Sequence, residues 1–313
     1  MKSRQTGSGL VELMISLVLG LLISALAMQM FMTSRASVST QEALSFLQES
    51  ARYASYRLQP MMRNIGYAGC ASNNLYIDPD LKNPPYSIEF PMGGKERTHR
   101  GLSYWEMTFV FADKEAGRAP LESISDEDNS LSLKSGYEKI FLNEAGNLVE
   151  KVASLSDCLN SEVFIIDKIV GGSIYPDSSL SRLYNSGSSP VSYVYPVKVW
   201  TLRLNDQGGN EEIRSLYLDR VGADFAAEEI VSGVTGFVIT FSLDTDGDGK
   251  VDTPNKAANS MTGDDWQKVR RIELALTLQS QPGAVSGGPN QGRLERTFNL
   301  TFTPRNLQLA GEG

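Results

Sequence analysis

The run of apolar and small residues from Leu13 to Met32 constrains this chain more than any other feature. It holds about twenty residues, the length that an α-helix needs to cross the hydrocarbon core of a bilayer. A cleavable secretion signal has a shorter apolar core of ~7–15 residues, so a conventional signal peptide cut after Ala36 fits this run poorly. Lys2 and Arg4 precede the run, and basic flanks stay on the cytoplasmic side. The sequence therefore predicts an anchored protein whose remaining residues are exported.

Charge and composition exclude several classes of function. The formal net charge is −8, with acidic and basic residues mixed along the chain, whereas a nucleic-acid groove needs clustered Lys and Arg. His99 is the one histidine, so a histidine-rich zinc site is excluded. It stands in a polar stretch where a solvated loop is expected. The acids Glu106, Asp113 and Glu122 form no pair arranged for acid–base catalysis. We expect no nucleic-acid partner and no enzymatic activity.

Glu12 stands at the edge of the apolar run, where a carboxylate costs ~2.5 kcal/mol or more if it enters the hydrocarbon. One interpretation places it at headgroup level, solvated. A second interpretation begins with Gly7. If the chain is cut after Gly7, the new amino group of Ser8 lies one helical turn before Glu12, and a buried carboxylate gains a cationic partner.

The segment Gly7-Ser-Gly-Leu-Val-Glu12-Leu-Met-Ile resembles the class III signal of type IV prepilins. That signal has a short basic leader, a Gly before the cut and a Glu at mature position five; the usual first mature residue is Phe, and Ser8 departs from this. The resemblance implies cleavage between Gly7 and Ser8 by a prepilin peptidase, N-methylation of the new terminus, and a role for Glu12 in assembly, docking a subunit's amino terminus.

The helical pattern continues beyond the apolar run. Apolar residues three and four positions apart form one narrow stripe: Leu44, Leu47, Ala51, Ala54, Leu58, Met61 and Ile65. We expect this amphipathic half to pack on a globular domain, although a coiled-coil dimerisation stalk would use the same stripe. Pro60 should kink the helix near its end, and Gly66 is a natural C-cap.

Alternating apolar residues in the last third predict antiparallel strands with one buried face. The three apolar sets are Phe237, Ile239, Phe241 and Leu243; Ile272, Leu274, Leu276 and Leu278; and Leu294, Phe298, Leu300 and Phe302. Tyr193–Leu204 and Ile213–Leu218 are expected to form a hairpin. We predict an α+β, pilin-like fold in which a four- or five-stranded sheet covers the Leu44–Ile65 stripe. Between helix and sheet, short strands are expected at Tyr104–Phe111, Leu131–Leu133 and Val163–Ile169.

These expectations divide the chain into six parts. They are a leader (1–7), a transmembrane half (8–33) and an amphipathic half (34–66) of one helix, a β-rich insertion (67–190), a C-terminal antiparallel sheet domain (191–308) with an Asp-rich loop (244–255), and a tail (309–313).

The Asp-rich loop Asp244-Thr-Asp-Gly-Asp-Gly-Lys-Val-Asp252 has the spacing of a calcium-binding loop. Its possible ligands are the carboxylates at positions one, three, five and nine and the carbonyl at position seven: Asp244, Asp246, Asp248, Asp252 and Lys250. The usual Glu at position twelve is replaced by Asn255, for which Asp264 or Asp265 could substitute. We predict a structural calcium ion here; the alternative is an acidic turn between strands.

Cys70 and Cys158 lie outside the membrane in the expected topology. Two cysteines alone cannot build a CxxC-type metal site, but they can form one disulfide in an oxidising compartment. We predict a Cys70–Cys158 bond; two buried free thiols are the alternative.

A second resemblance extends to both ends of the globular part. The segment Arg63-Asn-Ile-Gly-Tyr-Ala-Gly-Cys70, the single later cysteine, the run from Val231 to Phe237 leading into the Asp-rich loop, and the closing Arg305-Asn306 resemble the PilW-type minor pilins. The resemblance implies a low-abundance subunit, first held in the inner membrane with its C-terminal domain in the periplasm and then in the pilus at the cell surface. It would help to initiate pilus assembly in a tip complex with other minor pilins and a pilus-tip adhesin, and the major pilin would be a further partner.

Two other functions fit the same sequence features. Pseudopilins of type II secretion systems share the signal and the plan. A membrane-tethered periplasmic enzyme or binding protein would keep its span uncut, and Glu12 would then be incidental.

Overall fold

The structure is a computed structural model that describes residues 9–71, 74–184, 191–207, 210–222, 226–285 and 289–307. The chain divides into two compact units. The first comprises Met1–Glu49 and Gln279–Arg296, and the second comprises Ser50–Leu278 and Thr297–Gly313. The helix α1 and two strands of the smaller sheet pass from one unit into the other.

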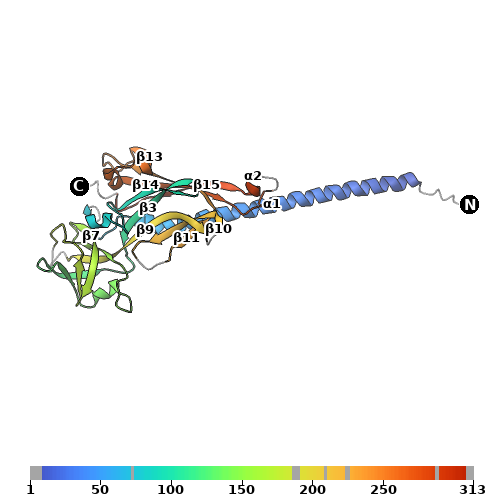
Figure 1. The fold of residues 1–313 in the computed structure, drawn as a ribbon. Coiled ribbons are helices and arrows are strands. Elements are labelled where there is room, and N and C mark those ends of the chain that lie inside the picture. Colours follow the sequence, from blue (N-terminus) through green and yellow to red (C-terminus); the bar gives the residue numbers. More distant parts are fainter. Residues whose placement is uncertain are drawn as a thin grey trace, which may run out of the picture. The chain divides into compact units, whose positions relative to one another are not determined.

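The predicted long helix is α1, which spans Leu10–Asn64 and holds 55 residues (Figure 1, blue). It continues as one α-helix through Pro60, four residues before its end. Beyond its end, Gly66 adopts φ +76°, where a Cβ would lie 2.9 Å from a Leu307 methyl group. Glycine is therefore required at the point where the chain leaves the helix, as expected for a C-cap.

The apolar stripe of α1 is buried along the part of the helix in the second unit. Ala51, Ala54, Leu58, Met61 and Ile65 are each at most 6% exposed. The chain itself therefore covers this stripe, which is the packing expected of an amphipathic helix on a globular domain and not of a free dimerisation seam.

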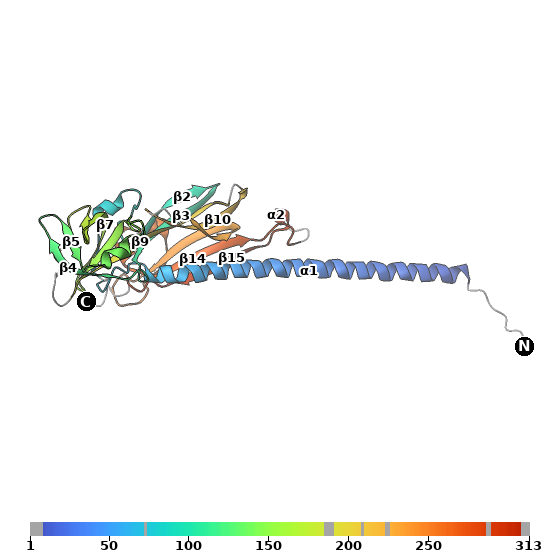
Figure 2. The same cartoon turned by 90° about the horizontal axis from the view of Figure 1, so that it is seen from below.

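The larger sheet contains eleven strands, and all of it lies in the second unit. Its main path runs β1-β7-β8-β5-β4-β9-β10-β11, while β2 and β3 extend from β9, and β6 lies between β7 and β9. The pairing of β1 with β7 is parallel, and the other pairs in this sheet are antiparallel. Figure 2 shows β4, β5 and β7 at one end of the sheet and β2, β3 and β10 at the other. The strands are β1 (Leu75–Ile77), β2 (Met92–His99), β3 (Leu102–Ala112), β4 (Ala119–Ser125), β5 (Ser130–Leu133), β6 (Val152–Ser156), β7 (Ser161–Val170), β8 (Ser173–Pro176), β9 (Tyr193–Gln207), β10 (Asn210–Arg220) and β11 (Glu228–Ser232).

The three strands expected in the insertion are present as β3, β5 and β7. The other strands of this region were not predicted, and His99 ends the strand β2 instead of lying in a loop. The expected hairpin is formed by β9 and β10, with Leu204 paired opposite Leu216. However, β9 also pairs with β3, β4 and β6, so the hairpin belongs to the same sheet as the insertion and not to the smaller sheet.

The smaller sheet has four strands in the order β13-β12-β14-β15. They are β12 (Val234–Leu243), β13 (Thr253–Ala257), β14 (Val269–Gln279) and β15 (Glu295–Phe302). The predicted alternation is confirmed, because every apolar residue of the first two sets is at most 3% exposed. In β15, Phe298 and Leu300 are half-buried and Phe302 is buried. Register matches this pattern, with Phe241 opposite Ile272 and Ile239 opposite Leu274.

Short helical turns connect the strands. They are the 3-10 helices η2 (Pro79–Lys82), η3 (Tyr137–Phe141), η4 (Ala258–Ser260) and η5 (Gly263–Gln267), and the short α2 (Pro289–Gly292). Two apolar clusters pack on the larger sheet. One centres on Val110, Val163 and Val197, and the other on Phe141, Leu155 and Phe164.

Candidate functional site

The first part of α1 exposes a continuous apolar surface. Its large apolar side chains from Leu10 to Met32 are 53% to 77% exposed. Within the described residues, α1 is the one helix that is long and apolar enough to span a membrane. An apolar surface of this extent is typical of a membrane or assembly interface, because water does not favour it. The helix is therefore compatible with a membrane anchor.

Three hydroxyl groups in this part of α1 find their hydrogen-bond partners within the helix. The hydroxyls of Ser16, Ser24 and Thr33 donate to the carbonyl oxygens of Glu12, Gly20 and Gln29, at 2.8 to 2.9 Å. Each bond reaches back one helical turn, so none of the three hydroxyls needs a partner from outside the helix. This arrangement suits a helix surrounded by lipid, where an unsatisfied polar group is costly.

Glu12 is the one charged residue between Leu10 and Ser34, and it lies in the first turn of α1 with its side chain exposed. Its amide donates to the Gly9 carbonyl at 2.8 Å. A carboxylate in the first turn is favoured by the positive end of the helix dipole. The predicted cleavage residues Gly7 and Ser8 lie outside the described residues, so cleavage stays a prediction.

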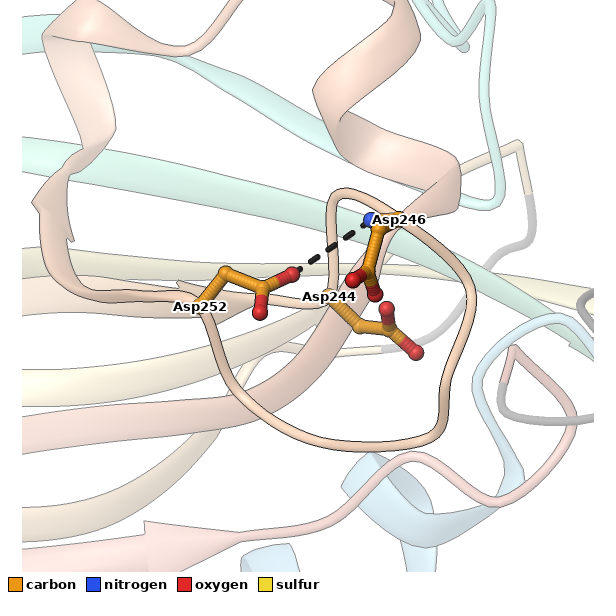
Figure 3. A group of neighbouring side chains, drawn as sticks. All are labelled: Asp244, Asp246 and Asp252. Carbon is orange, nitrogen blue, oxygen red and sulfur yellow. Dashed lines mark hydrogen bonds between the residues drawn. The ribbon is translucent and has the colours of Figure 1, made fainter.

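The Asp-rich loop follows β12 and brings three of the predicted ligands together. Carboxylate oxygens of Asp244, Asp246 and Asp252 all lie within 4.8 Å of one another. Figure 3 shows these side chains inside one turn of the loop, with Asp246 donating its amide to Asp252 at 3.4 Å. The Thr245 amide also donates to Asp252, at 2.7 Å. Asp244 is 3% exposed, whereas Asp246 and Asp252 are exposed.

Asp248 does not join this cluster. Its carboxylate accepts from the Lys250 amide at 2.8 Å and from the Lys250 ammonium at 3.0 Å. These bonds from Lys250 lower the pKa of Asp248. Asp265, one of the suggested substitutes for position twelve, is also bound elsewhere, since it accepts from Lys256 at 2.7 Å. Asp264 lines a cavity beside Asp244 and Asp246.

Asp244 already has a cationic partner that the sequence did not reveal. Arg270 in β14 donates to its Oδ2 through Nε at 2.8 Å and Nη2 at 2.5 Å. The amides of Gly247 and Gly249 donate to the same carboxylate at 2.7 and 2.9 Å. Burial raises the pKa of Asp244, but the bonds from Arg270 and the two amides outweigh it, and the net shift is downward.

These contacts define how the loop residues fit a calcium ion. Oxygen donors from three carboxylates and the Lys250 carbonyl are of the chemical type that calcium prefers. Against this, Arg270 holds Asp244, so an ion at the cluster competes with the guanidinium for the same oxygen. Calcium binding remains a prediction.

The predicted disulfide is confirmed, because Cys70 and Cys158 are bonded with their Cα atoms 4.7 Å apart. Both residues are exposed, and Cys158 has a positive φ of 67°. The chain before Cys70 passes close to β6: a Cβ on Gly69 would lie 2.4 Å from the Cβ of Ser156. The bond therefore joins the segment after α1 to the turn between β6 and β7.

Among the ion pairs of the second unit that sequence reasoning missed, two join partners far apart in the chain. Glu150 and Arg220 form a buried pair, with each side chain 7% exposed. Arg57 in α1 binds Glu228 through two bonds of 2.8 and 2.6 Å. The partners of each pair are distant in the chain and meet only in the folded domain, so no local pattern indicates them.

These features describe a class of protein: an α+β chain that carries one long N-terminal apolar helix and a large, mostly antiparallel sheet, and that offers an assembly or membrane surface. Residues 201–304 match the family described as Type IV Pilus-assembly protein W. The match covers about a third of the chain, from the middle of β9 to just beyond β15, and supports a relation to type IV pilus proteins. Searches of curated proteins and of solved structures found no match.

Proposed function

We propose that the chain is a minor pilin, a low-abundance subunit that helps to initiate type IV pilus assembly. The exposed apolar half of α1 carries this proposal, because a helix of this length with one acid in its first turn is built to be covered by lipid or by other helices. The family match over the C-terminal third supports the same class of function.

In this proposal the chain is cut between Gly7 and Ser8 by a prepilin peptidase and is held in the inner membrane with its globular part in the periplasm. It then enters the pilus beside other minor pilins, the major pilin and a tip adhesin. Glu12 pairs with the amino terminus of a subunit, which removes the cost of burying a lone carboxylate. The role is assembly and not catalysis.

Processing is tested by the intact mass of the membrane-bound protein. We expect the wild type to lack Met1–Gly7 and the Gly7→Ala variant to keep them, to stay in the membrane and to fail in assembly. Normal trimming and normal piliation in Gly7→Ala would contradict the proposal.

Deletion of the gene separates a pilin from a secretion pseudopilin. We expect loss of surface pili with protein secretion intact. Loss of secretion with normal pili would assign the chain to a type II secretion system. If neither changes and the membrane form keeps its first seven residues, the chain is a tethered periplasmic protein.

A further inference from the structure

The outward face of α1 in the second unit is unusual for an exposed helix surface. Its exposed residues are Arg52, Tyr53, Tyr56, Gln59, Pro60 and Arg63, and we call the last five the tyrosine–arginine face. They lie opposite the buried stripe, as their spacing of three and four residues requires. Tyr53 is 45% exposed and Tyr56 is 76% exposed. Tyrosine and arginine are the residues most often found as anchors of protein interfaces.

The charge of this segment is opposite to that of the chain. Residues 50–64 carry three arginines and no acidic residue, although the chain has a net charge of −8. Arg57 is neutralised by Glu228. Arg63 is exposed, and in the described part of the chain its guanidinium makes no hydrogen bond or ion pair. A cation therefore remains available on the tyrosine–arginine face.

Lys114 adds a second cation to the same surface. With Tyr56, Gln59, Pro60 and Arg63 it lines an open groove of about 610 Å³. Its ammonium donates to Asn64 Oδ1 at 3.1 Å and lies 4.0 Å from the centre of the Tyr67 ring. Among the described residues it has no carboxylate partner, so the bonds that orient it leave its charge uncompensated.

Pro60 lines the groove and removes one backbone hydrogen-bond donor from α1. Because proline has no amide hydrogen, the Tyr56 carbonyl lacks its usual partner one turn later in the helix. The groove thus presents two cations and one exposed aromatic ring. This combination fits a segment that carries carboxylates.

We propose that the tyrosine–arginine face docks an acidic segment of another pilus subunit. The inference rests on the proposed function, because it names the partner's chemistry at a surface of the same subunit. A membrane is the less suitable partner, since Arg63 follows Met32 by roughly 45 Å along α1 at 1.5 Å per residue.

Site-specific photo-crosslinking in intact piliated cells tests the proposal. A benzophenone amino acid replaces Tyr56, and the matched control replaces Tyr137, a tyrosine of η3 that is 44% exposed. We expect the probe at position 56 to crosslink to another pilus subunit within a carboxylate-rich peptide, at a yield at least tenfold above that of position 137. A crosslink to lipid, to a peptide without acids, or to no other chain would overturn the proposal.

Charge reversal at Arg63 provides a second test of the proposal. Arg63→Glu should lower the crosslink yield from position 56 at least tenfold, and an acid-to-lysine change in the crosslinked peptide should restore it. Lys134→Glu makes the same charge change at an exposed residue outside the face and should leave the yield unchanged. Arg63 also lies in the last turn of α1, where a cation stabilises the helix, so the melting temperature of each variant is measured alongside. An unchanged yield in a folded Arg63→Glu variant would contradict the proposal.

The two proposals fail in different ways. If deletion of the gene leaves pili intact, the proposed function is wrong whatever the crosslinking shows. If deletion abolishes pili while Tyr56→Ala and Arg63→Glu assemble them normally, only the docking surface is wrong.

Discussion

Removal of the Cys70–Cys158 disulfide should destabilise the second unit by a predictable amount. The bond joins residues separated by 88 positions. In the chain-entropy model, opening a loop of this length lowers the free energy of the unfolded state by about 4.6 kcal/mol at 25 °C. For a unit of this size, that loss corresponds to a fall in melting temperature on the order of 10–15 °C. In the native state, Cys70 Sγ also lies 3.4 Å from the Ser156 hydroxyl, and the substitution changes this contact too.

Urea unfolding of the full chain in detergent micelles measures this loss. Trp105, Trp200 and Trp266 all lie in the second unit, so tryptophan fluorescence reports its unfolding. We expect a Cys70→Ser, Cys158→Ser double variant and the reduced wild type to unfold at the same, lower urea concentration. A reductant should not change the double variant further, which controls for its other effects. Equal midpoints for the oxidised wild type and the double variant would refute the estimate.

Three further predictions concern the same fluorescence transition. Leu58→Ala should lower the free energy of unfolding by about 2–5 kcal/mol, because Leu58 is fully buried in α1. The exposed control Tyr56→Ala should change it by no more than about 0.5 kcal/mol. Equal effects of the two variants would contradict the packing of α1. If the Asp-rich loop binds calcium, millimolar calcium should raise the melting temperature of the wild type but not of an Asp246→Ala, Asp248→Ala variant, and a flat wild-type curve would leave only an acidic turn. Burial raises the pKa of Glu162, so the folded state keeps a proton that the unfolded chain has released. The unfolding free energy should therefore fall by up to about 1.4 kcal/mol per pH unit as the pH rises from the pKa of Glu162 in the unfolded chain to its pKa in the folded state. Glu162→Gln should remove this pH dependence.

The parts of the fold that could be predicted from the sequence are those with a buried and an exposed side. The stripe of α1 repeats every three to four residues because one side of the helix is covered, and β12 and β14 alternate because one face of each strand is covered. Each of these patterns is local, so it can be found without knowing what covers the buried side.

The insertion could not be predicted as well because its strands lack this asymmetry. All five residues of β6 are buried, including Ser154 and Ser156, so the strand has no exposed polar face. The opposite holds for β2, whose residues from Gly94 to Thr98 are exposed and whose Gly and charged residues favour loops over strands. It is a strand because each residue from Met92 to His99 pairs with β3, and such pairing depends on the partner's position and not on local propensity.

The Asp-rich loop shows the same limit at the level of a site. Its spacing correctly indicated that Asp244, Asp246 and Asp252 converge, because alternate residues of a tight glycine-containing loop face inward. The spacing does not show whether a cation from elsewhere in the chain reaches these carboxylates. Arg270 supplies positive charge from within the chain, and it reaches Asp244 because β12 and β14 pair with Leu243 opposite Val269. Whether the loop needs an ion therefore depends on the register of β12 and β14. An Arg270→Met variant separates the contribution of Arg270 from that of a bound calcium ion. If Arg270 competes with calcium for Asp244, this variant should bind calcium more tightly than the wild type; if the loop is only an acidic turn, the variant should be less stable and calcium should not restore it.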